Sequence, residues 1–445
     1  MKNMCALTVL GALTLLSAAC GESEPSAKPA STQVSAPSAT TSASTTSESS
    51  RELTTTTSAT TIPTTTAADD TWISDLELID TTFRTLHNDP FAVVPEATWS
   101  ARIAQLKESF PTLSHDERVV GFGSLMGLLD DHTQFFSPNQ RTYEVWLYQF
   151  SDGWFVVAAK DPSLVGTRLV SINGTSAADV AAAIRPLIPG DNESSKLNAV
   201  YLMADVTYLH GLGIVDDPAK PAFRFARVDG SEFTIDLSSS LGGDFYGQLH
   251  LFGSMAGDKN EAARRRGEPI WSRIDEPTKS FLLSLNDYTS NGRSEAIAAM
   301  TAALDAGTVD HVVVDMRYLR GGQGGLLYPI VNALKDDPRI NRPGGLTILI
   351  GRENESAATL IASTLDHDTA ATFVGEMTPA RADNFLCNQC HDVDLPKSGY
   401  VFSVPDDRAG NGDPRMAIQP DIPVALSSAD YFAGRDPALD IALAG

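Results

Sequence analysis

The second half of the chain alternates between short apolar runs and helical segments, and this alternation constrains the fold most strongly. Three runs typical of buried β-strands lie at 311–317 (HVVVDMR), 346–350 (LTILI) and 372–376 (TFVGE). A glycine-rich turn and the helical stretch LLYPIVNALKDD follow the first run, and a serine with a small-residue helix follows the second. Because strands that alternate with helices form layered α/β structures, we expect an α/β core over 246–445.

The first part of the folded chain has the apolar spacing of helices. Apolar residues recur at helical intervals in three segments, 72–87, 98–110 and 114–136. The third segment opens with Ser114 and Glu117, the two residues of a capping box. We therefore expect a helical subdomain over 69–140, in which the apolar stripes pack as a core.

Between 141 and 245 the apolar period changes to that of short strands. GWFVVAA and FRFARVDGSEFTIDL flank a stretch, LVGTRLVSINGTSAADVAAAIRPLI, that predicts a strand, an Asn-Gly turn, a second strand and a helix. The segment GTRLVSINGTSAADV resembles part of a PDZ domain. The resemblance covers about 90 residues and implies a PDZ-like module, which captures extended peptides by strand addition.

The first 20 residues have the pattern of an export signal. Lys2 precedes an apolar run that is too short for a stable membrane span, and small residues follow it. The sequence SAAC at 17–20 resembles the lipobox of bacterial lipoproteins, which implies lipidation at Cys20. We therefore expect an exported lipoprotein anchored on the extracytoplasmic face of the cell membrane. The alternative is a cleaved, freely secreted protein.

Residues 21–68 have the composition of a disordered tether. Of these 48 residues 25 are Ser or Thr, and none is aromatic. Such a segment cannot bury enough apolar surface to offset the entropy lost on ordering. We interpret it as a flexible link between the anchor and the folded part.

The net charge of −23 narrows the range of partners. Binding to duplex nucleic acid rests on Lys and Arg side chains that neutralise phosphates, so nucleic acid is not an expected partner. Electrostatic docking on an anionic membrane is disfavoured for the same reason. The acidity is also explained by solubility alone.

Three short motifs suggest a catalytic constellation. They are DDHTQFF with His132, DMRYLRGGQGG at 315–325, and NESAAT at 354–359, which contains Ser356. Ser356 stands where an apolar strand gives way to a helix, so it is either a helix N-cap or a nucleophile. A serine hydroxyl needs a positioned base, and histidine has a suitable pKa for that role.

A serine nucleophile also needs N–H donors for the oxyanion of its intermediate. Glycines present backbone N–H groups without an obstructing Cβ. Gly321 and Gly322 follow one strand and Ala357 follows the next. They can act together if the two strands are neighbours.

These motifs resemble the tail-specific, or carboxyl-terminal processing, serine peptidase family. The resemblance is carried by VVVDMRYLRGGQGG, ILIGRENESAATLIA, FVGEMTP, QPDIPV, GRDPALD and LLDDHTQFF, and it covers roughly residues 75–442. The family also has the layout predicted for this chain, with a helical subdomain, a PDZ-like module and a catalytic core in that order. The resemblance implies a crotonase-like core of stacked ββα units and peptide hydrolysis through an acyl-enzyme.

The family divides by its general base. One branch has a lysine about 25 residues after the serine, but Arg381 holds that position here, and a guanidinium cannot act as a base. The branch similar to tricorn protease and interphotoreceptor retinoid-binding protein uses a histidine that His132 matches. The resemblance thus implies Ser356 as nucleophile and His132 as base. The carboxylate that orients His132 stays open among Asp131, Asp413 and Asp421, of which Asp421 is expected to be structural. Glu376 is expected either to lie near the site or to be structural.

The remaining cysteines form the pattern C-x-x-C-H at Cys387, Cys390 and His391. This pattern attaches haem in c-type cytochromes, and it can contribute to zinc sites. An exported protein lies in an oxidising compartment, so we expect a local Cys387–Cys390 disulfide and no metal or cofactor.

The sequence therefore predicts an extracytoplasmic serine endopeptidase that cleaves unfolded or carboxyl-terminal polypeptide segments. The first alternative is an inactive lipoprotein that binds peptides or a hydrophobic ligand on the same fold. The second is a crotonase-like enzyme acting on an acyl thioester, although no basic patch for a nucleotide is present. The sequence does not indicate the oligomeric state.

Overall fold

The computed structural model describes residues 72–129, 133–137, 139–190, 192–242, 260–386, 390–410 and 412–445, which all belong to one compact unit. The expected signal segment, Cys20, the tether, Asp131, His132 and Cys387 lie outside these residues. Among the described residues, no helix has both the length and the apolar character needed to cross a membrane.

Three helices form the first part of the described chain, as their apolar spacing predicted. They are α1 (Ile73–Leu86), α2 (Glu96–Ser109) and α3 (His115–Met126). The 3-10 turn η1 (Phe110–Thr112) directly follows α2. The predicted capping box is present, with Ser114 N donating to Glu117 Oε2 at 2.8 Å.

The third helix ends earlier than the apolar pattern predicted, at Met126 rather than near 136. Gly127 follows, and a Cβ at Gly127 would lie only 1.8 Å from the carbonyl oxygen of Pro186. The chain therefore passes against another backbone at this glycine. Residues Gln134–Phe136 form strand β1 instead of helix.

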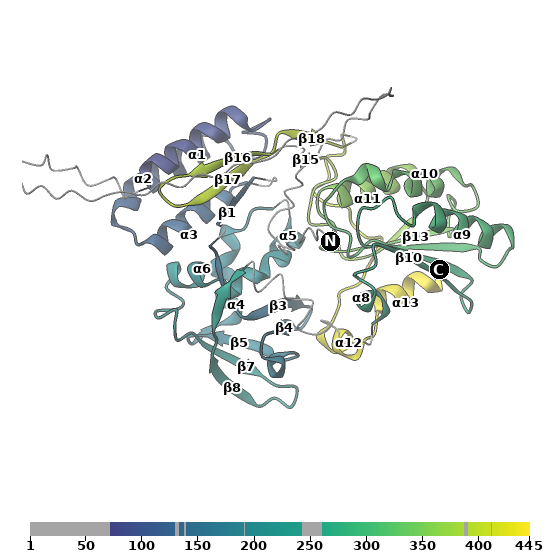
Figure 1. Cartoon of the computed structure of the whole chain (residues 1–445), viewed down its shortest axis with the longest axis horizontal. Coiled ribbons are helices and arrows are strands. Elements are labelled where there is room, and N and C mark those ends of the chain that lie inside the picture. The colour runs from purple at the N-terminus through teal and green to yellow at the C-terminus, as the bar shows by residue number, and fades with distance from the viewer. Residues whose placement is uncertain are drawn as a thin grey trace, which may run out of the picture. The chain divides into compact units, whose positions relative to one another are not determined.

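A hairpin from the far end of the chain completes this helical part. Strand β1 pairs antiparallel with β17 (Tyr400–Val404), which pairs in turn with β16 (His391–Leu395) (Figure 1). Leu395 and Phe402 are buried in the same hydrophobic cluster as the three helices. Buried Asp75 on α1 accepts the backbone N–H of Ser398, at the hairpin turn, at 2.7 Å. No local sequence signal indicated this long-range pairing.

The middle part contains an antiparallel sheet with the strand order β3-β4-β5-β7-β8. Its strands are β3 (Val145–Phe150), β4 (Gly153–Ala159), β5 (Arg168–Ile172), β7 (Ala222–Ala226) and β8 (Glu232–Asp236). The predicted Asn-Gly turn follows β5, with φ of 48° at Asn173 and 83° at Gly174. It leads to β6 (Thr175–Ser176) and then to helix α4 (Ala177–Ile184), as predicted.

Shorter elements surround this sheet. They are β2 (Arg141–Tyr143), β9 (Ser239–Leu241), η2 (Pro162–Leu164), η3 (Arg185–Leu187), α5 (Glu193–Asn198), η4 (Ala199–Ala204) and α6 (Val206–Gly211). Strands β2 and β9 pair with each other. The domain boundaries predicted from the sequence, and the PDZ-like identity of this part, stay predictions.

The last part is a layered α/β core around a six-stranded sheet with the order β10-β11-β12-β13-β14-β19. Its strands are β10 (Ile270–Asp275), β11 (Ser280–Leu285), β12 (His311–Asp315), β13 (Leu346–Ile350), β14 (Thr372–Gly375) and β19 (Ile422–Pro423). All pairings from β11 to β19 are parallel, and β10 is antiparallel to β11. The three strands predicted from the sequence are therefore neighbours.

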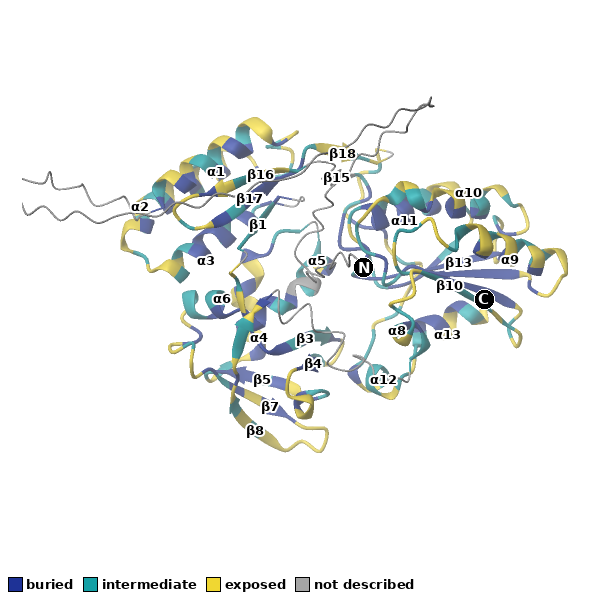
Figure 2. Ribbon diagram, in the orientation of Figure 1, coloured by how far each residue is buried: buried dark blue, intermediate teal, exposed yellow. Residues whose placement is uncertain are grey.

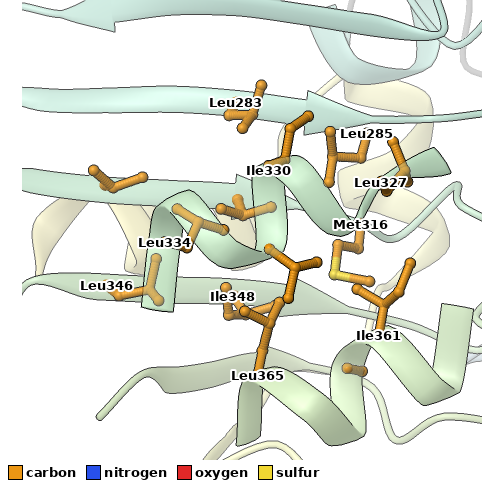
Figure 3. Close-up of a cluster of buried hydrophobic side chains, with 14 of the residues drawn as sticks. Leu283, Leu285, Met316, Leu327, Ile330, Leu334, Leu346, Ile348, Ile361 and Leu365 are labelled. Atoms are coloured by element: carbon orange, nitrogen blue, oxygen red, sulfur yellow. The ribbon is translucent and has the colours of Figure 1, made fainter. Parts of the chain in front are cut away.

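Helices cover both faces of this sheet (Figure 1). One face packs against α9 (Arg293–Asp305), α10 (Tyr328–Asp336) and α11 (Ala357–Asp368), and the other packs against α13 (Pro437–Ala444). Strands β11, β12 and β13 are buried along their whole length for this reason (Figure 2). The larger cluster joins Leu283 and Ile348 of the sheet to Ile330 and Ile361 of the helices (Figure 3).

The remaining short elements complete the core. They are α8 (Glu261–Arg264), η7 (Gly324–Leu326), β15 (Asn384–Leu386), β18 (Asp407–Ala409) and α12 (Ser428–Ala433). Strands β15 and β18 pair antiparallel. The described architecture is thus mixed α/β, while the crotonase-like classification of the core stays a prediction.

A buried histidine lies at the amino ends of the parallel strands. His311 Nδ1 is 3.1 Å from Ser280 Oγ, and its Nε2 is 2.9 Å from Thr347 Oγ1. Burial lowers the pKa of His311; nearby Asp310 works against this shift and Arg342 adds to it. Burial therefore favours the neutral form of the ring in the folded protein.

We expect this histidine to make the protein less stable in mild acid. The unfolded chain takes up the proton first, at a pKa of about 6.5, so stability is full above that pH and falls as the pH drops through it. Urea unfolding at pH 7.5 and pH 5 should show a larger loss for the wild type than for His311→Gln, which cannot titrate in this range. Equal losses in the two proteins would contradict the prediction.

Candidate active site

Ser356 lies at the turn between strand β13 and helix α11, in a backbone conformation that side chains rarely adopt. Its φ is 51° and its ψ is −120°. It occupies the N-cap position, but its side chain makes no capping hydrogen bond to the helix. Such conformations cost about 1–3 kcal/mol and are found where the surrounding structure enforces them, often at functional sites. The capping role therefore does not explain this serine.

Buried Asn354 enforces this turn. Its Oδ1 accepts the N–H of Gly351 at 2.8 Å, which closes the chain tightly after β13. Its Nδ2 donates to the carbonyl oxygens of Met316 and Leu319, at 2.5 and 2.8 Å. One fully buried amide thus ties the serine turn to the loop after β12.

The glycine-rich loop after β12 lies directly beside Ser356, because β12 and β13 are adjacent and parallel. A Cβ placed on Gly321 would be 3.0 Å from Ser356 Cβ and 3.6 Å from Ser356 Oγ. A Cβ on Gly324 would be 3.3 Å from Ala357 Cβ. The structure therefore places the predicted Gly321 beside Ser356, and Gly324 of the same loop beside Ala357.

Three backbone donors remain available at this place. The N–H groups of Gly321, Gly322 and Ala357 donate to no acceptor among the residues that the structure describes. Ala357 begins helix α11, whose first N–H groups have no partner within the helix and carry partial positive charge. The site can therefore stabilise an anionic oxygen next to Ser356.

Two arginines neutralise the carboxylate of Glu353, three positions before Ser356. Glu353 Oε2 accepts from Arg320 Nε at 2.9 Å and from Arg266 Nη2 at 2.5 Å. Burial works to raise the pKa of Glu353, but Arg266 and Arg320 outweigh it and hold the pKa below its usual range. Glu353 is therefore a fixed anion that anchors Arg320, the residue before Gly321, and is not suited to proton transfer at neutral pH.

A small open pocket, with a volume of about 80 Å³, lies at the carboxyl ends of β13 and β14. Its lining includes Tyr148, Arg352 and Glu376, and Ser356 is not among the lining residues. Buried Arg352 donates through Nε to Glu376 at 3.0 Å, and it donates to the carbonyl oxygen of Gln149 at 2.8 Å. Glu376, which was expected either to lie near the site or to be structural, is thus paired with Arg352.

The other candidate carboxylates also have partners in the described part of the chain. Asp421 accepts the N–H of Phe373 at 2.8 Å, which is the structural role predicted for it. Asp413 accepts from Arg415 Nε at 2.8 Å. Asp131 and His132 themselves lie outside the described residues, so the orientation of the base stays a prediction.

The cysteine motif is described only in part. Cys390 is disulfide-bonded, while its predicted partner Cys387 lies outside the described residues, so the pairing stays a prediction. Within the described ranges no group of three or more His, Cys, Asp or Glu side chains is placed to hold a metal ion. Lys397, the first lysine after Arg381, is exposed on the β16–β17 turn.

Sequence reasoning missed the residues that hold the site together. Asn354 lies inside one of the motifs but was not predicted to have a role, and Tyr288 lies in none of the motifs. Tyr288 Oη donates to the carbonyl oxygen of Arg320 at 2.7 Å. The position of Asn354, two residues before a candidate nucleophile, could have suggested a role in shaping the turn. Nothing near Tyr288 in the sequence indicated its contact with Arg320.

Comparison with known proteins shows which solved structures have a similar fold. No protein-family model and no curated protein matches the chain. The structure of mature CPAF complexed with lactacystin has a TM-score of 0.59 and 13% identity, covering 84% of this chain and 97% of that one. A second structure of mature CPAF has a TM-score of 0.59 and 14% identity, covering 84% and 96%.

A structure of the photosystem II D1 C-terminal processing protease also matches, with a TM-score of 0.39 and 13% identity over 84% of this chain and 99% of that one. Likeness at such identities concerns the fold alone. The chain therefore has the fold of mature CPAF.

Proposed function

We propose that the chain is a serine endopeptidase that cleaves unfolded or carboxyl-terminal polypeptide segments through an acyl-enzyme. The observation that carries the proposal is the strained backbone of Ser356 at a strand-to-helix turn. It lies beside the N–H groups of Gly321, Gly322 and Ala357, which have no acceptor among the described residues. Nucleophilic serines of other hydrolases occupy turns of this kind, where the hydroxyl is exposed next to oxyanion donors. The fold of mature CPAF agrees with this proposal.

In the proposed mechanism, Ser356 Oγ attacks the carbonyl carbon of the scissile peptide bond. His132 removes the hydroxyl proton and then donates it to the nitrogen of the leaving amine. The N–H groups of Gly321 or Gly322 and of Ala357 bind the negatively charged oxygen of the tetrahedral intermediate. Water, deprotonated by the same histidine, then releases the acyl group and restores Ser356.

The setting of this reaction also belongs to the proposal. Lipidation at Cys20, the Ser/Thr-rich tether and a Cys387–Cys390 disulfide fit an exported enzyme that is held at the extracytoplasmic face of a membrane. A PDZ-like middle part would present an extended peptide to a crotonase-like core. These points rest on the sequence motifs alone.

A fluorophosphonate probe tests the proposed activity directly. The purified chain should become covalently labelled, and digestion with mass spectrometry should place the label on Ser356. Absence of labelling, under conditions where a related peptidase is labelled, would favour an inactive peptide-binding or ligand-binding protein. Label on another residue would refute the site assignment.

The choice of base predicts a pH profile and two contrasting variants. His132 must be neutral to accept the Ser356 proton, so kcat/KM should fall as the pH drops through the pKa of the free enzyme, with an unperturbed value of about 6.5. His132→Ala should lower kcat/KM by about 100-fold or more. Lys397→Ala should stay within a few-fold of wild type, because Lys397 is exposed on a hairpin turn. The reverse pattern would identify a Ser–Lys enzyme.

A further inference from the structure

Tyr288 touches the glycine-rich loop at two places, on either side of Gly321. Its hydroxyl donates to the carbonyl oxygen of Arg320 at 2.7 Å. Its ring lies against Gly322, where an added Cβ would be 2.4 Å from Tyr288 Cδ2 and 2.8 Å from Cε2. The side chain therefore spans Gly321, which lies between these contacts and beside Ser356.

The hydroxyl contact fixes the direction of one particular N–H group. The peptide between Arg320 and Gly321 is planar, and in a trans peptide the C=O and the N–H point in opposite directions. The Arg320 oxygen is held toward Tyr288, so the Gly321 N–H is held away from Tyr288. That N–H has no acceptor among the described residues, and Gly321 itself borders the Ser356 side chain.

Glu353 holds the side chain of Arg320, but Gly321 and Gly322 have no side chains that would fix the backbone after it. Asn354 holds the preceding carbonyl of Leu319 at 2.8 Å, and Gly324 N donates to Gly322 O at 3.0 Å. Between these two points, the Arg320–Gly321 peptide depends on Tyr288 for a hydrogen bond. Glycine has the widest conformational freedom of any residue, so loss of this contact would allow the peptide to rotate.

The tyrosine is suited to hold this carbonyl at any working pH. Burial, and to a lesser extent the charge of Asp287, raise the pKa of Tyr288 far above its usual range. The phenol therefore stays protonated and remains a donor. The ring packs against the main hydrophobic cluster of the core, which limits its movement.

We propose that Tyr288 is a positioning residue that aims the Gly321 N–H into the oxyanion hole of Ser356. It acts through the Arg320 carbonyl and touches neither substrate nor reacting atoms. The inference rests on the proposed function, because an oxyanion forms only if Ser356 attacks the carbonyl carbon of a substrate. It adds a residue from outside every sequence motif to the site.

Tyr288→Phe removes the hydroxyl and keeps the ring. We expect kcat for a fluorogenic peptide to fall about 10-fold while KM changes less than about 2-fold, because the lost interaction acts in the transition state. Affinity for a peptidyl boronate, which forms a tetrahedral adduct with the serine, should weaken by a similar factor. Binding of the cleaved product peptide should not change, and the pH profile should keep its shape.

Tyr328→Phe is the matched control, since Tyr328 is an exposed tyrosine of the same core, at 41% exposure. It should behave as wild type in every assay. Gly322→Ala serves as a second variant, because its added Cβ displaces the Tyr288 ring without removing the hydroxyl. It should lower kcat and boronate affinity. In the Gly322→Ala background, Tyr288→Phe should lower kcat by a smaller factor than it does in the wild type.

The outcomes separate this inference from the proposed function. Absence of fluorophosphonate labelling in the wild type would refute the proposed function. Suppose that the wild type is labelled at Ser356. If Tyr288→Phe then has the same kcat and boronate affinity as the wild type, the inference about Tyr288 is overturned and the proposed function is not. If Tyr288→Phe does not fold, unchanged kcat in Gly322→Ala would overturn it instead. Equal losses of product binding and boronate affinity would show a merely structural role.

Discussion

Replacing Ser356 with glycine should abolish peptidase activity and at the same time stabilise the protein. The hydroxyl is the proposed nucleophile, so kcat should fall by at least about 1,000-fold. The backbone of Ser356, with φ of 51° and ψ of −120°, is strained for serine but accessible to glycine. Relief of a strain of about 1–3 kcal/mol exceeds the entropic cost of glycine, about 0.5–1 kcal/mol, so the free energy of unfolding should rise by about 1 kcal/mol.

Ser356→Ala is the matched control for this experiment. It removes the same hydroxyl and should lose the same activity, but it keeps a Cβ and therefore keeps the backbone strain. Urea unfolding of the two variants isolates the strain, because any hydrogen bond of the hydroxyl is lost in both. A glycine variant no more stable than the alanine variant would show that the backbone is not strained, and residual activity in either variant would refute the nucleophile.

Removing the carboxylate of Asp436 should strongly destabilise the folded protein. Arg317, after strand β12, forms paired hydrogen bonds to Asp315, at 2.9 and 2.7 Å, and to Asp436, both at 2.7 Å. Asp436 also caps helix α13 by accepting the N–H of Leu439 at 3.1 Å. The side chains of Asp436 and Arg317 are only 12% and 18% exposed.

Asp436→Ala leaves a largely buried guanidinium with half of its partners and removes the helix cap. Breaking a buried ion pair by deleting one member costs about 3–5 kcal/mol, and a lost cap costs about 1 kcal/mol. We expect the free energy of unfolding to fall by about 3–5 kcal/mol in total, since Asp315 retains part of the pairing. Differential scanning calorimetry or urea unfolding would measure this loss.

Asp440→Ala provides the control in the same helix. Asp440 is exposed in the first turn of α13, so its removal changes the net charge equally and should shift stability by less than about 0.5 kcal/mol. Similar losses in the two variants would show that the Arg317 pairs contribute little and that charge alone matters. Asp315 and Arg317 belong to the motif DMRYLRGGQGG, and Asp436 belongs to GRDPALD. The result would therefore also test whether ion pairing between these two motifs stabilises the fold.

The sequence by itself determined the elements whose signals are local. The Ser114–Glu117 capping box, the Asn173–Gly174 turn and the three strands HVVVD, LTILI and TFVG formed as predicted, because hydrogen bonds within a few residues and burial on both faces specify them. The neighbourhood of Gly321 and Ser356 followed from the parallel order of those strands. The mixed α/β class of the core also followed from the alternation of strands and helices in the sequence.

Only the tertiary structure decided the contacts that join distant segments. Arg317 and Asp436 are 119 positions apart, and strand β1 pairs with β17 from the other end of the chain. Tyr288 follows β11 and reaches Arg320, 32 positions away after the neighbouring β12. Ser356 acquires its strained backbone from a turn closed by Asn354. Such contacts depend on where the whole backbone places two groups. Short-range patterns specify the strands and helices, whereas the aim of a single N–H group is specified only by the packed molecule.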